Sequence, residues 1–258
     1  RPRYSRGVAA PLRILHLTDP HLHARRDARL RGVNTDDTLV ATLGHALAET
    51  PRPAAVLATG DLVQDESRGG YERFRELLGG LGIPVYCLPG NHDDPGLMRE
   101  LLGTPPFQFC GEARLGTWTL VMLDTYARQD DAGVLSASEL ARLDRSLAAA
   151  GKGPSLVALH HQPVAMGSEW LDGVPLRNAM EFLAVCDRHP GLRAILWGHV
   201  HQASDRVRQG VRLLSTPSTC AQFLPGSATF AMDTRPPGYR WLDLHDDGRI
   251  ETRIVWLE

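Results

Sequence analysis

The 258-residue sequence has little cysteine, no long apolar run and no surplus of charge of either sign. Its four cysteines lie far apart and form no C-x-x-C pair, which argues against a disulfide scaffold or a zinc knuckle. No apolar run approaches the roughly 18 residues of a membrane span. The formal net charge of -2 lacks the basic surplus of a strongly electrostatic nucleic-acid binder. We therefore expect neither a membrane nor a nucleic acid as a partner.

The start of the sequence also lacks the pattern of a signal peptide, because residues 1–6 (RPRYSR) contain no apolar stretch. Cysteines without an obvious pairing suit a reducing compartment. Both observations predict a cytoplasmic protein, although residue 1 is not methionine and a targeting segment ahead of it stays open.

Short apolar runs rich in branched residues alternate with segments of helical spacing over the first two-thirds of the chain, and the last part is mostly strand-like. This order is typical of layered α/β architecture, so we expect one domain, residues 1–258, with mixed sheets inside and helices outside. Ser136 and Glu139 form a capping-box pattern, and Asp36 and Asp37 lie where a helix N-terminus favours carboxylates. The expected strands are 12–17, 54–59, 83–88, 118–123, 155–159, 194–197, 211–215, 239–244 and 250–257. The expected helices are 35–49, 70–81, 95–102, 136–149 and 176–188.

Residues 216–237 are rich in Pro, Ser, Thr and Gly and predict a long loop. Loops of this length in compact domains are usually functional or disordered. The loop contains Cys220, Phe223, Phe230 and Met232, and this content favours a functional loop.

Polar residues follow five of the expected strands at the point where each strand ends. Open α/β sheets bind their ligands at the carboxyl edge of the strands, so these residues are expected to meet at one site. The polar groups are Asp19-Pro20-His21, Gly60-Asp61, Gly90-Asn91-His92-Asp93, His160-His161 and Gly198-His199-Val200-His201.

The residue types in these groups predict a metal centre. Members two apart leave a strand on one face, provided the strand geometry persists. Carboxylates mixed with imidazoles suit Mn, Fe or Zn better than Mg or Ca. The glycines Gly60, Gly90 and Gly198 permit unusual torsions and close packing beside an ion. Seven candidate ligands suit two ions that share a carboxylate: Asp19, His21, Asp61, Asn91, His160, His199 and His201.

Each group alone also has a simple structural explanation. A D-x-H or H-x-H pair often marks a surface turn, and Gly-Asp or Gly-Asn-His-Asp is common turn chemistry. Five such groups in order, each after an expected strand, favour a site over a set of unrelated turns.

The remaining histidines are interpreted structurally. His16 lies inside the first strand on the face opposite Leu15 and Leu17, as a satisfied core residue or one that supports the site. His161 is expected to face away from His160, which leaves His160 as the ligand. We expect the other histidines at helical, helix-end and turn positions to be solvated: His45, His189 and His245.

The motifs D-x-H, G-D, G-N-H-D, H and G-H-x-H, in this order, resemble the calcineurin-like metallophosphoesterase superfamily over roughly residues 12–220. Several shorter segments look like the bacterial class III cyclic-AMP phosphodiesterases. These segments are 32–34, 58–62, 170–172, 176–178, 217–223, 233–234 and 237–238.

The resemblance implies a sandwich of two packed mixed β-sheets flanked by helices. It also implies two divalent transition-metal ions, with iron or manganese expected and zinc as the alternative. Asp61 would bridge the two ions. The first ion would be held by Asp19, His21, Asp61 and His201, and the second by Asp61, Asn91, His160 and His199.

The implied reaction is hydrolysis of 3',5'-cyclic AMP to 5'-AMP, with a hydroxide between the metals as nucleophile. Two divalent ions, two carboxylates and a hydroxide sum to a charge of about +1, which attracts a phosphodiester monoanion. His92, a non-ligand, would protonate the leaving oxygen. The side chain that would assist His92 is not assigned. Gln64 occupies the position where some relatives have an acid, and the acid here is Asp65. The substrate would contact His21, Asp61, Asn91, His92 and His201.

Three alternatives remain at this point. The same fold can act on another phosphodiester or a nucleotide monoester. A nuclease is disfavoured by the missing basic stripe and by a length that leaves no room for DNA-engaging domains. A non-enzymatic scaffold with a vestigial metal site is expected to have lost His92 or some ligands, and all are present.

The sequence leaves open which residues contact the nucleotide base and how many copies of the chain assemble. Four residues follow the strands that carry candidate ligands, and they either line the site or pack within the loops. One of them, Arg177, could also pair with a surface carboxylate. Both a monomer and a homodimer are compatible with the sequence. The four residues are Trp170, Arg177, Asn178 and Phe223.

Overall fold

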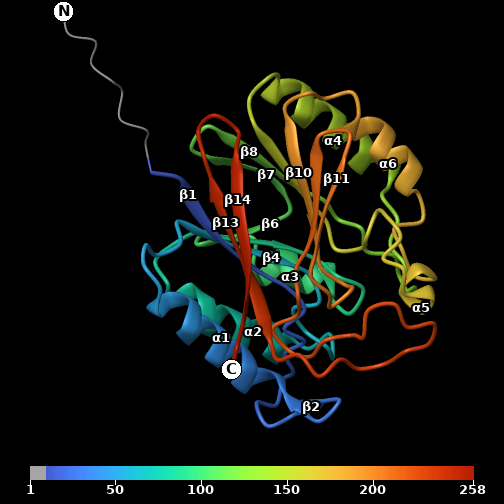
Figure 1. The fold of residues 1–258 in the computed structure, drawn as a ribbon. Helices are drawn as coiled ribbons and strands as arrows, with labels where there is room; N and C mark the ends of the chain where they lie inside the picture. Colours follow the sequence, from blue (N-terminus) through green and yellow to red (C-terminus); the bar gives the residue numbers. More distant parts are fainter. Residues whose placement is uncertain (1–9) are drawn as a thin grey trace, which may run out of the picture.

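A computed structural model describes residues 10–258 (Figure 1). Two six-stranded mixed sheets form its centre. The segment 1–6, on which the expectation of a missing signal peptide rests, lies outside the described residues. In order, the first sheet consists of β14 (Ile250–Trp256), β13 (Gly238–Leu244), β1 (Leu12–Leu17), β4 (Ala55–Thr59), β5 (Val85–Leu88) and β6 (Phe107–Phe109). The second consists of β11 (Ser204–Arg208), β12 (Val211–Ser215), β10 (Leu192–Trp197), β9 (Ser155–Ala158), β8 (Trp118–Met122) and β7 (Gly111–Leu115).

Both sheets have a parallel centre. Strands β1, β4, β5 and β6 pair in parallel, as do β12, β10, β9 and β8. Antiparallel strands complete the edges, with β13 and β14 beside β1, β11 beside β12, and β7 beside β8. Because parallel strands share one direction, their carboxyl ends meet at one edge, and this edge carries the polar groups predicted from the sequence.

Helices cover the two outer faces, as Figure 1 shows. The helices α1 (Thr35–Ala48), α2 (Arg68–Gly79) and α3 (Pro95–Leu101) pack on the first sheet. The second sheet carries α4 (Ala137–Ala150), α5 (Glu169–Asp172) and α6 (Ala179–Cys186). A short hairpin, β2 (Arg29–Leu30) and β3 (Val33–Asn34), precedes α1. The α/β fold with two packed mixed sheets flanked by helices is therefore confirmed.

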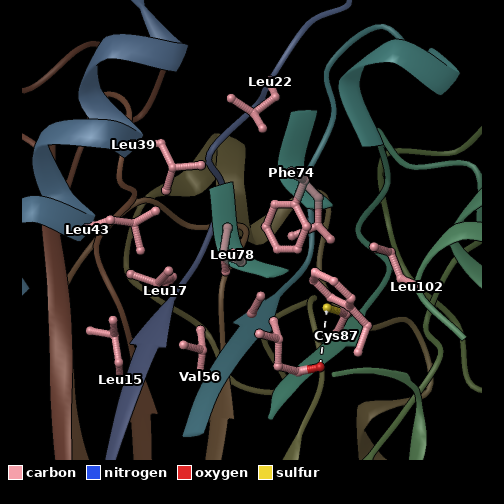
Figure 2. Packing of buried hydrophobic residues seen from close by; sticks show 14 of the residues in the cluster. Leu15, Leu17, Leu22, Leu39, Leu43, Val56, Phe74, Leu78, Cys87 and Leu102 are labelled. Carbon is pink, nitrogen blue, oxygen red and sulfur yellow. Dashed lines mark hydrogen bonds between the residues drawn. The ribbon is translucent and has the colours of Figure 1, made fainter. Parts of the chain in front are cut away.

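Three buried clusters hold these layers together. Figure 2 shows the cluster between the first sheet and its helices, where Leu15 and Leu17 of β1 face Leu39 and Leu43 of α1. A second cluster lies beneath the helices of the other sheet. The third fills the space between the sheets and includes Ile14. Successive side chains of β1 thus enter different layers, which explains why strands buried on both faces are apolar almost throughout.

Helix starts follow the sequence only in part. The side chain of Ser136 accepts a hydrogen bond from the Glu139 amide at 3.1 Å, as a capping box requires. The Glu139 carboxylate does not return to Ser136 but accepts from the Asp124 amide at 3.1 Å and binds Arg142. Only half of the predicted box is formed. At α1, whose first turn carries the predicted acidic pair, Asn34 is the cap.

The elements missing from the sequence prediction are short or polar. Both β11 and β7 are edge strands with largely exposed side chains, so they lack an apolar run that could announce them. The strands β2, β3 and β6 have two or three residues each, and α5 has four. The last expected helix, 176–188, is shorter in the structure and covers only Ala179–Cys186. Within residues 10–258, no helix combines the length and apolar character needed to cross a bilayer.

Candidate metal centre

The ends of β1, β4, β5, β9 and β10 bring all seven predicted ligands to one place. Six of them are buried, and Asn91 is half-buried. Because buried carboxylates and imidazoles are costly unless paired or coordinated, this concentration needs a compensating partner. The six are Asp19, His21, Asp61, His160, His199 and His201.

The first half of the site contains Asp19, His21 and His201. One ligand atom from each lies within 4.8 Å of the others. The Nε2 atom of His201 is 3.3 Å from Asp19 Oδ1 and 3.1 Å from His21 Nε2. These three side chains match the first predicted metal position, apart from the shared carboxylate.

The second half lies around His160. Its Nε2 atom is 3.1 Å from Asn91 Oδ1 and 3.4 Å from Asp61 Oδ2. The rings of His160 and His199 have centroids 5.0 Å apart. The same Asp61 oxygen is 3.8 Å from His21 Nε2 in the first half. Asp61 therefore stands between the two halves, where a carboxylate shared by two ions is needed.

Backbone carbonyls fix the orientation of three imidazoles. The Nδ1 atoms of His160 and His201 donate to the carbonyls of Thr59 at 2.8 Å and Ala221 at 2.6 Å, and His199 Nε2 donates to that of Val174 at 3.1 Å. A carbonyl only accepts, so each of these nitrogens carries the proton. In the neutral form of each ring the other nitrogen has its lone pair free, which is the arrangement found in metal-ligating histidines.

The electrostatics also fit a cation. Burial lowers the pKa of His21 and of His199 to about 3, which leaves both rings neutral and able to coordinate. Burial acts in the same direction on His160, but the neighbouring Asp61 outweighs it and raises the pKa to about 9. The pKa of Asp61 is lowered in return, because its buried carboxylate faces His160 and other imidazoles. In the protein alone a proton on His160 balances Asp61, and a metal ion would take its place.

The backbone at the site is unusual. Five candidate ligands have a positive φ between 46° and 66°, in the left-handed region that residues with a side chain seldom adopt. The strand geometry assumed for the D-x-H and H-x-H pairs therefore does not persist. Instead of sharing one face, the histidines of the second pair serve different halves of the site. The five residues are Asp19, His21, Asp61, His199 and His201.

The glycines beside the candidate ligands allow neighbouring loops to touch. A Cβ atom on Gly90 would collide with the carboxylate and the backbone nitrogen of Asp61. One on Gly198 would collide with the Thr18 hydroxyl and lie 2.7 Å from Asp19 Oδ2. The close packing predicted for these glycines is thus made against residues of adjacent strand ends.

Replacing Gly90 by alanine is expected to displace Asp61 and to weaken metal binding. Overpacking of this kind typically costs about 1–3 kcal/mol. Metal content of the purified variant and its thermal unfolding midpoint check this prediction. Gly44→Ala is the matched control, because a Cβ there meets no atom within 4 Å, and it should keep its metal. Full metal content in Gly90→Ala would contradict the argument.

His92 lies at the mouth of the site and is half-buried. Its ring centroid is 5.4 Å from that of His21, and its backbone amide donates to Asp61 Oδ1 at 2.9 Å. The Gln64 side chain is 3.1 Å from His92 Nδ1. Asp65 instead accepts from the backbone of Ala24 and from Ser67. Gln64 is therefore the group that contacts His92.

A cavity of about 350 Å³ opens beside His92. Every residue predicted to contact the substrate lines it: His21, Asp61, Asn91, His92 and His201. Trp170 and Phe223 line it too, so they are wall residues as well as loop packing. Arg177 and Asn178 do not, because Arg177 pairs with Asp130 at 2.6 Å and Asn178 bonds the backbone of Leu135.

The arrangement of ligand types and loops agrees with the sequence comparison. The family model described as "Calcineurin-like phosphoesterase" matches residues 12–203. The chain belongs to the calcineurin-like phosphoesterase family. The resemblance drawn from the five motifs is confirmed, and with it the expectation of a metal-dependent phosphoesterase.

Curated calcineurin-like phosphoesterases resemble the chain over nearly its whole length. A 3',5'-cyclic adenosine monophosphate phosphodiesterase CpdA from Pseudomonas aeruginosa is 42% identical over 246 residues, which cover 95% of this chain and 90% of the relative. The protein of the same name from Escherichia coli K12 is 40% identical over 250 residues, with the same coverage. The similarity therefore includes the loop and strands that follow the region matched by the family model.

Solved structures share the fold at much lower sequence identity. A dimetal phosphatase from Danio rerio superposes with a TM-score of 0.66 at 16% identity and covers 97% of this chain and 100% of its own. GAP50 from Plasmodium gives the same TM-score at 11% identity, covering 96% of this chain and 85% of its own. These likenesses concern the architecture of the calcineurin-like phosphoesterases alone.

His161 does not face away from the site in this calcineurin-like phosphoesterase. Strand β9 ends at Ala158, so strand alternation no longer governs the two histidines that follow. The His161 ring lies 4.9 Å from that of His160 and 4.7 Å from that of His199, and its Nδ1 is 2.8 Å from the Thr125 hydroxyl. The expectation of opposite orientations is therefore wrong.

The other histidines divide into confirmed and corrected predictions. His16 is fully buried and satisfied on both nitrogens, by the Thr59 and Thr216 hydroxyls at 2.8 Å each. His45 is exposed, and His189 is half-buried beside Asp144. His245, expected in solvent, is only 8% exposed because the turn between β13 and β14 packs on Trp118 of the other sheet.

Proposed function

We propose that this calcineurin-like phosphoesterase hydrolyses 3',5'-cyclic AMP to 5'-AMP at a centre of two divalent transition-metal ions. The observation that carries the proposal is the pair of ligand clusters joined by Asp61, with His92 beside them in one cavity. Relatives at 42% and 40% identity are 3',5'-cyclic adenosine monophosphate phosphodiesterases, and this likeness supports cyclic AMP as the substrate. A cytoplasmic location and the choice between monomer and homodimer stay predictions.

The residues divide between the two ions as the family pattern implies. Asp19, His21, Asp61 and His201 would hold the first, and Asp61, Asn91, His160 and His199 the second. When bound, such a pair lowers the pKa of water and offsets the negative charge that builds on the phosphoryl oxygens. Imidazole with carboxylate ligands favours iron or manganese, with zinc as the alternative.

His92 supplies the proton in this proposal. A water molecule gives up one proton to solvent and its oxygen forms the new bond to phosphorus. The bond from phosphorus to the 3'-oxygen breaks, and protonated His92 donates its proton to the departing 3'-oxygen and is reprotonated from solvent. A ribose alkoxide is a poor leaving group, so this donation lowers the barrier substantially. The Gln64 amide can offer its oxygen to the Nδ1 proton of protonated His92 or its NH2 group to the neutral ring. It can therefore orient His92 before and after the transfer.

Removal of the metals is expected to abolish hydrolysis and to destabilise the fold. Each ion present at 1,000 times its dissociation constant contributes about 4 kcal/mol, which corresponds to a change of roughly 8–16 °C in the unfolding midpoint. The measurement is turnover and calorimetry after chelation, followed by separate addition of Mn²⁺, Fe²⁺ and Zn²⁺. Full activity in protein whose metal content is zero would refute a metal-dependent reaction.

The substrate is tested by identifying the product. Cyclic AMP should yield 5'-AMP and no 3'-AMP, because the proposed attack breaks the bond to the 3'-oxygen. Parallel assays with 2',3'-cyclic AMP, cyclic GMP and 5'-AMP distinguish the alternative of another phosphodiester or a nucleotide monoester. Two bound metal ions without release of 5'-AMP would retain the family and reject this substrate.

A further inference from the structure

Three aromatic side chains form one wall of the cavity. Trp170 comes from α5, whereas Phe223 and Phe230 come from the loop 216–237, which reaches across to α5 in Figure 1. The three ring centroids lie 5.1–5.4 Å apart, and each pair meets edge to face. We call these three residues the aromatic wall. In edge-to-face pairs the edge of one ring meets the face of the next, so the three rings form one continuous apolar surface.

The aromatic wall touches the candidate metal centre. The ring of Phe223 stacks on that of His201 at a centroid distance of 4.0 Å and an interplanar angle of 11°. A phosphate beside His201 and His92 would therefore carry its attached group within reach of the wall, inside the same cavity. The cavity is lined both by the aromatic wall and by polar residues of the candidate metal centre, so it suits an amphipathic ligand.

The loop 216–237 keeps part of the aromatic wall exposed to solvent. Phe230 is 41% exposed and Met232 beside it 37%. Backbone hydrogen bonds between Leu224 and Ala231 at 2.8 Å and from Asp233 to Gln222 at 2.9 Å pin the loop. These bonds fix the loop in a form that keeps large apolar surface in water, an arrangement more typical of a binding site than of loop packing.

The hairpin β2–β3 closes the cavity from the other side. The guanidinium of Arg31 lies over the Phe230 ring, 4.6 Å from its centroid, and lines the cavity. Arg31 is exposed, and its side-chain donors face no carboxylate among the residues the structure describes. A ligand edge rich in acceptors would find donors here.

We propose that the aromatic wall, with Met232 and Arg31, binds the nucleobase of the cyclic nucleotide. The inference rests on the proposed function, and it adds which residues distinguish a nucleotide from other phosphodiesters. A purine offers a flat π-face for stacking on Phe230 and Trp170, and its ring nitrogens accept hydrogen bonds from Arg31. Neither Arg177 nor Asn178 takes part, since both are engaged elsewhere.

The test compares two ligands that differ only in the base. Metal-loaded protein is titrated calorimetrically with 5'-AMP and with ribose 5-phosphate. Loss of one stacking partner typically weakens binding by about tenfold or more. In Phe230→Ala we expect 5'-AMP to bind about tenfold more weakly and ribose 5-phosphate to bind as in the wild type. Phe230→Tyr keeps the ring and should restore 5'-AMP binding.

Leu224→Ala is the matched control, because Leu224 is in the same loop with 43% exposure but does not line the cavity. It should bind both ligands like the wild type. Equal weakening of both ligands in Phe230→Ala, or no change in either, would overturn the inference. Because binding is measured without turnover, a base preference at Phe230 and the hydrolysis of cyclic AMP are judged separately. Failure of hydrolysis alone rejects the proposed function and not the base site.

Discussion

His92→Ala should retain both metal ions and hydrolyse cyclic AMP about 10²–10⁴-fold more slowly than the wild type. The imidazole lines the cavity beside the ligand clusters, and the seven proposed ligands do not include it. Its removal therefore takes away a proton donor and leaves the ions in place. Metal analysis together with kcat measured at saturating substrate checks both halves of this expectation.

The leaving group provides the sharper comparison. A p-nitrophenolate departs without needing a proton, so bis(p-nitrophenyl) phosphate should lose far less turnover in His92→Ala than cyclic AMP does. His189→Ala is the control histidine, because His189 bonds Asp144 on the surface and lies outside the cavity. Equal losses on both substrates, or near-normal turnover of cyclic AMP, would remove the acid role from His92.

Asp61→Asn should reduce the bound metal from two ions to fewer than one per chain and bring turnover to the level of the metal-free protein. Asp61 lies between the two halves, and its charge offsets the buried imidazoles on both sides. An asparagine oxygen can still accept from the His92 amide, so the fold around it is expected to remain. Metal content and calorimetry measure the effect.

Asp65→Asn is the matched control for this variant. Asp65 is close in sequence, but its carboxylate accepts from Ala24 and Ser67 and takes no part in the ligand clusters. It should keep two metals and near-normal turnover. If Asp61→Asn retained both ions, a shared carboxylate could not be the basis of the site.

The buried strands were predictable from sequence because they are apolar on both faces and end in polar groups. The apolar pattern does not predict edge strands such as β11, whose side chains face solvent. It does not predict α5 either, because α5 is a single short turn. The candidate ligands were found from residue type and order. Their convergence follows from the shared carboxyl edge of the strands, as predicted. The orientations within the D-x-H and H-x-H pairs arise instead from left-handed turns, which strand alternation does not predict.

The walls of the cavity were harder to predict for a related reason. The sequence points to Trp170 and Phe223, and equally to Arg177, because they follow strands that end in candidate ligands. It does not point to Arg31, since the hairpin of Arg31 lies far from the other wall residues in sequence. Gln64 contacts His92 only because the loops after β4 and β5 meet, and such contacts between loops depend on the tertiary fold.

The left-handed backbone at five candidate ligands sets stability against metal binding. Each such residue costs of the order of 1–3 kcal/mol unless the surrounding structure holds it in place. Glycine or asparagine would relieve this cost, but glycine offers no ligand atom and asparagine no charge. At these five positions a more stable chain would therefore be a poorer metal binder, as expected where activity depends on a strained site.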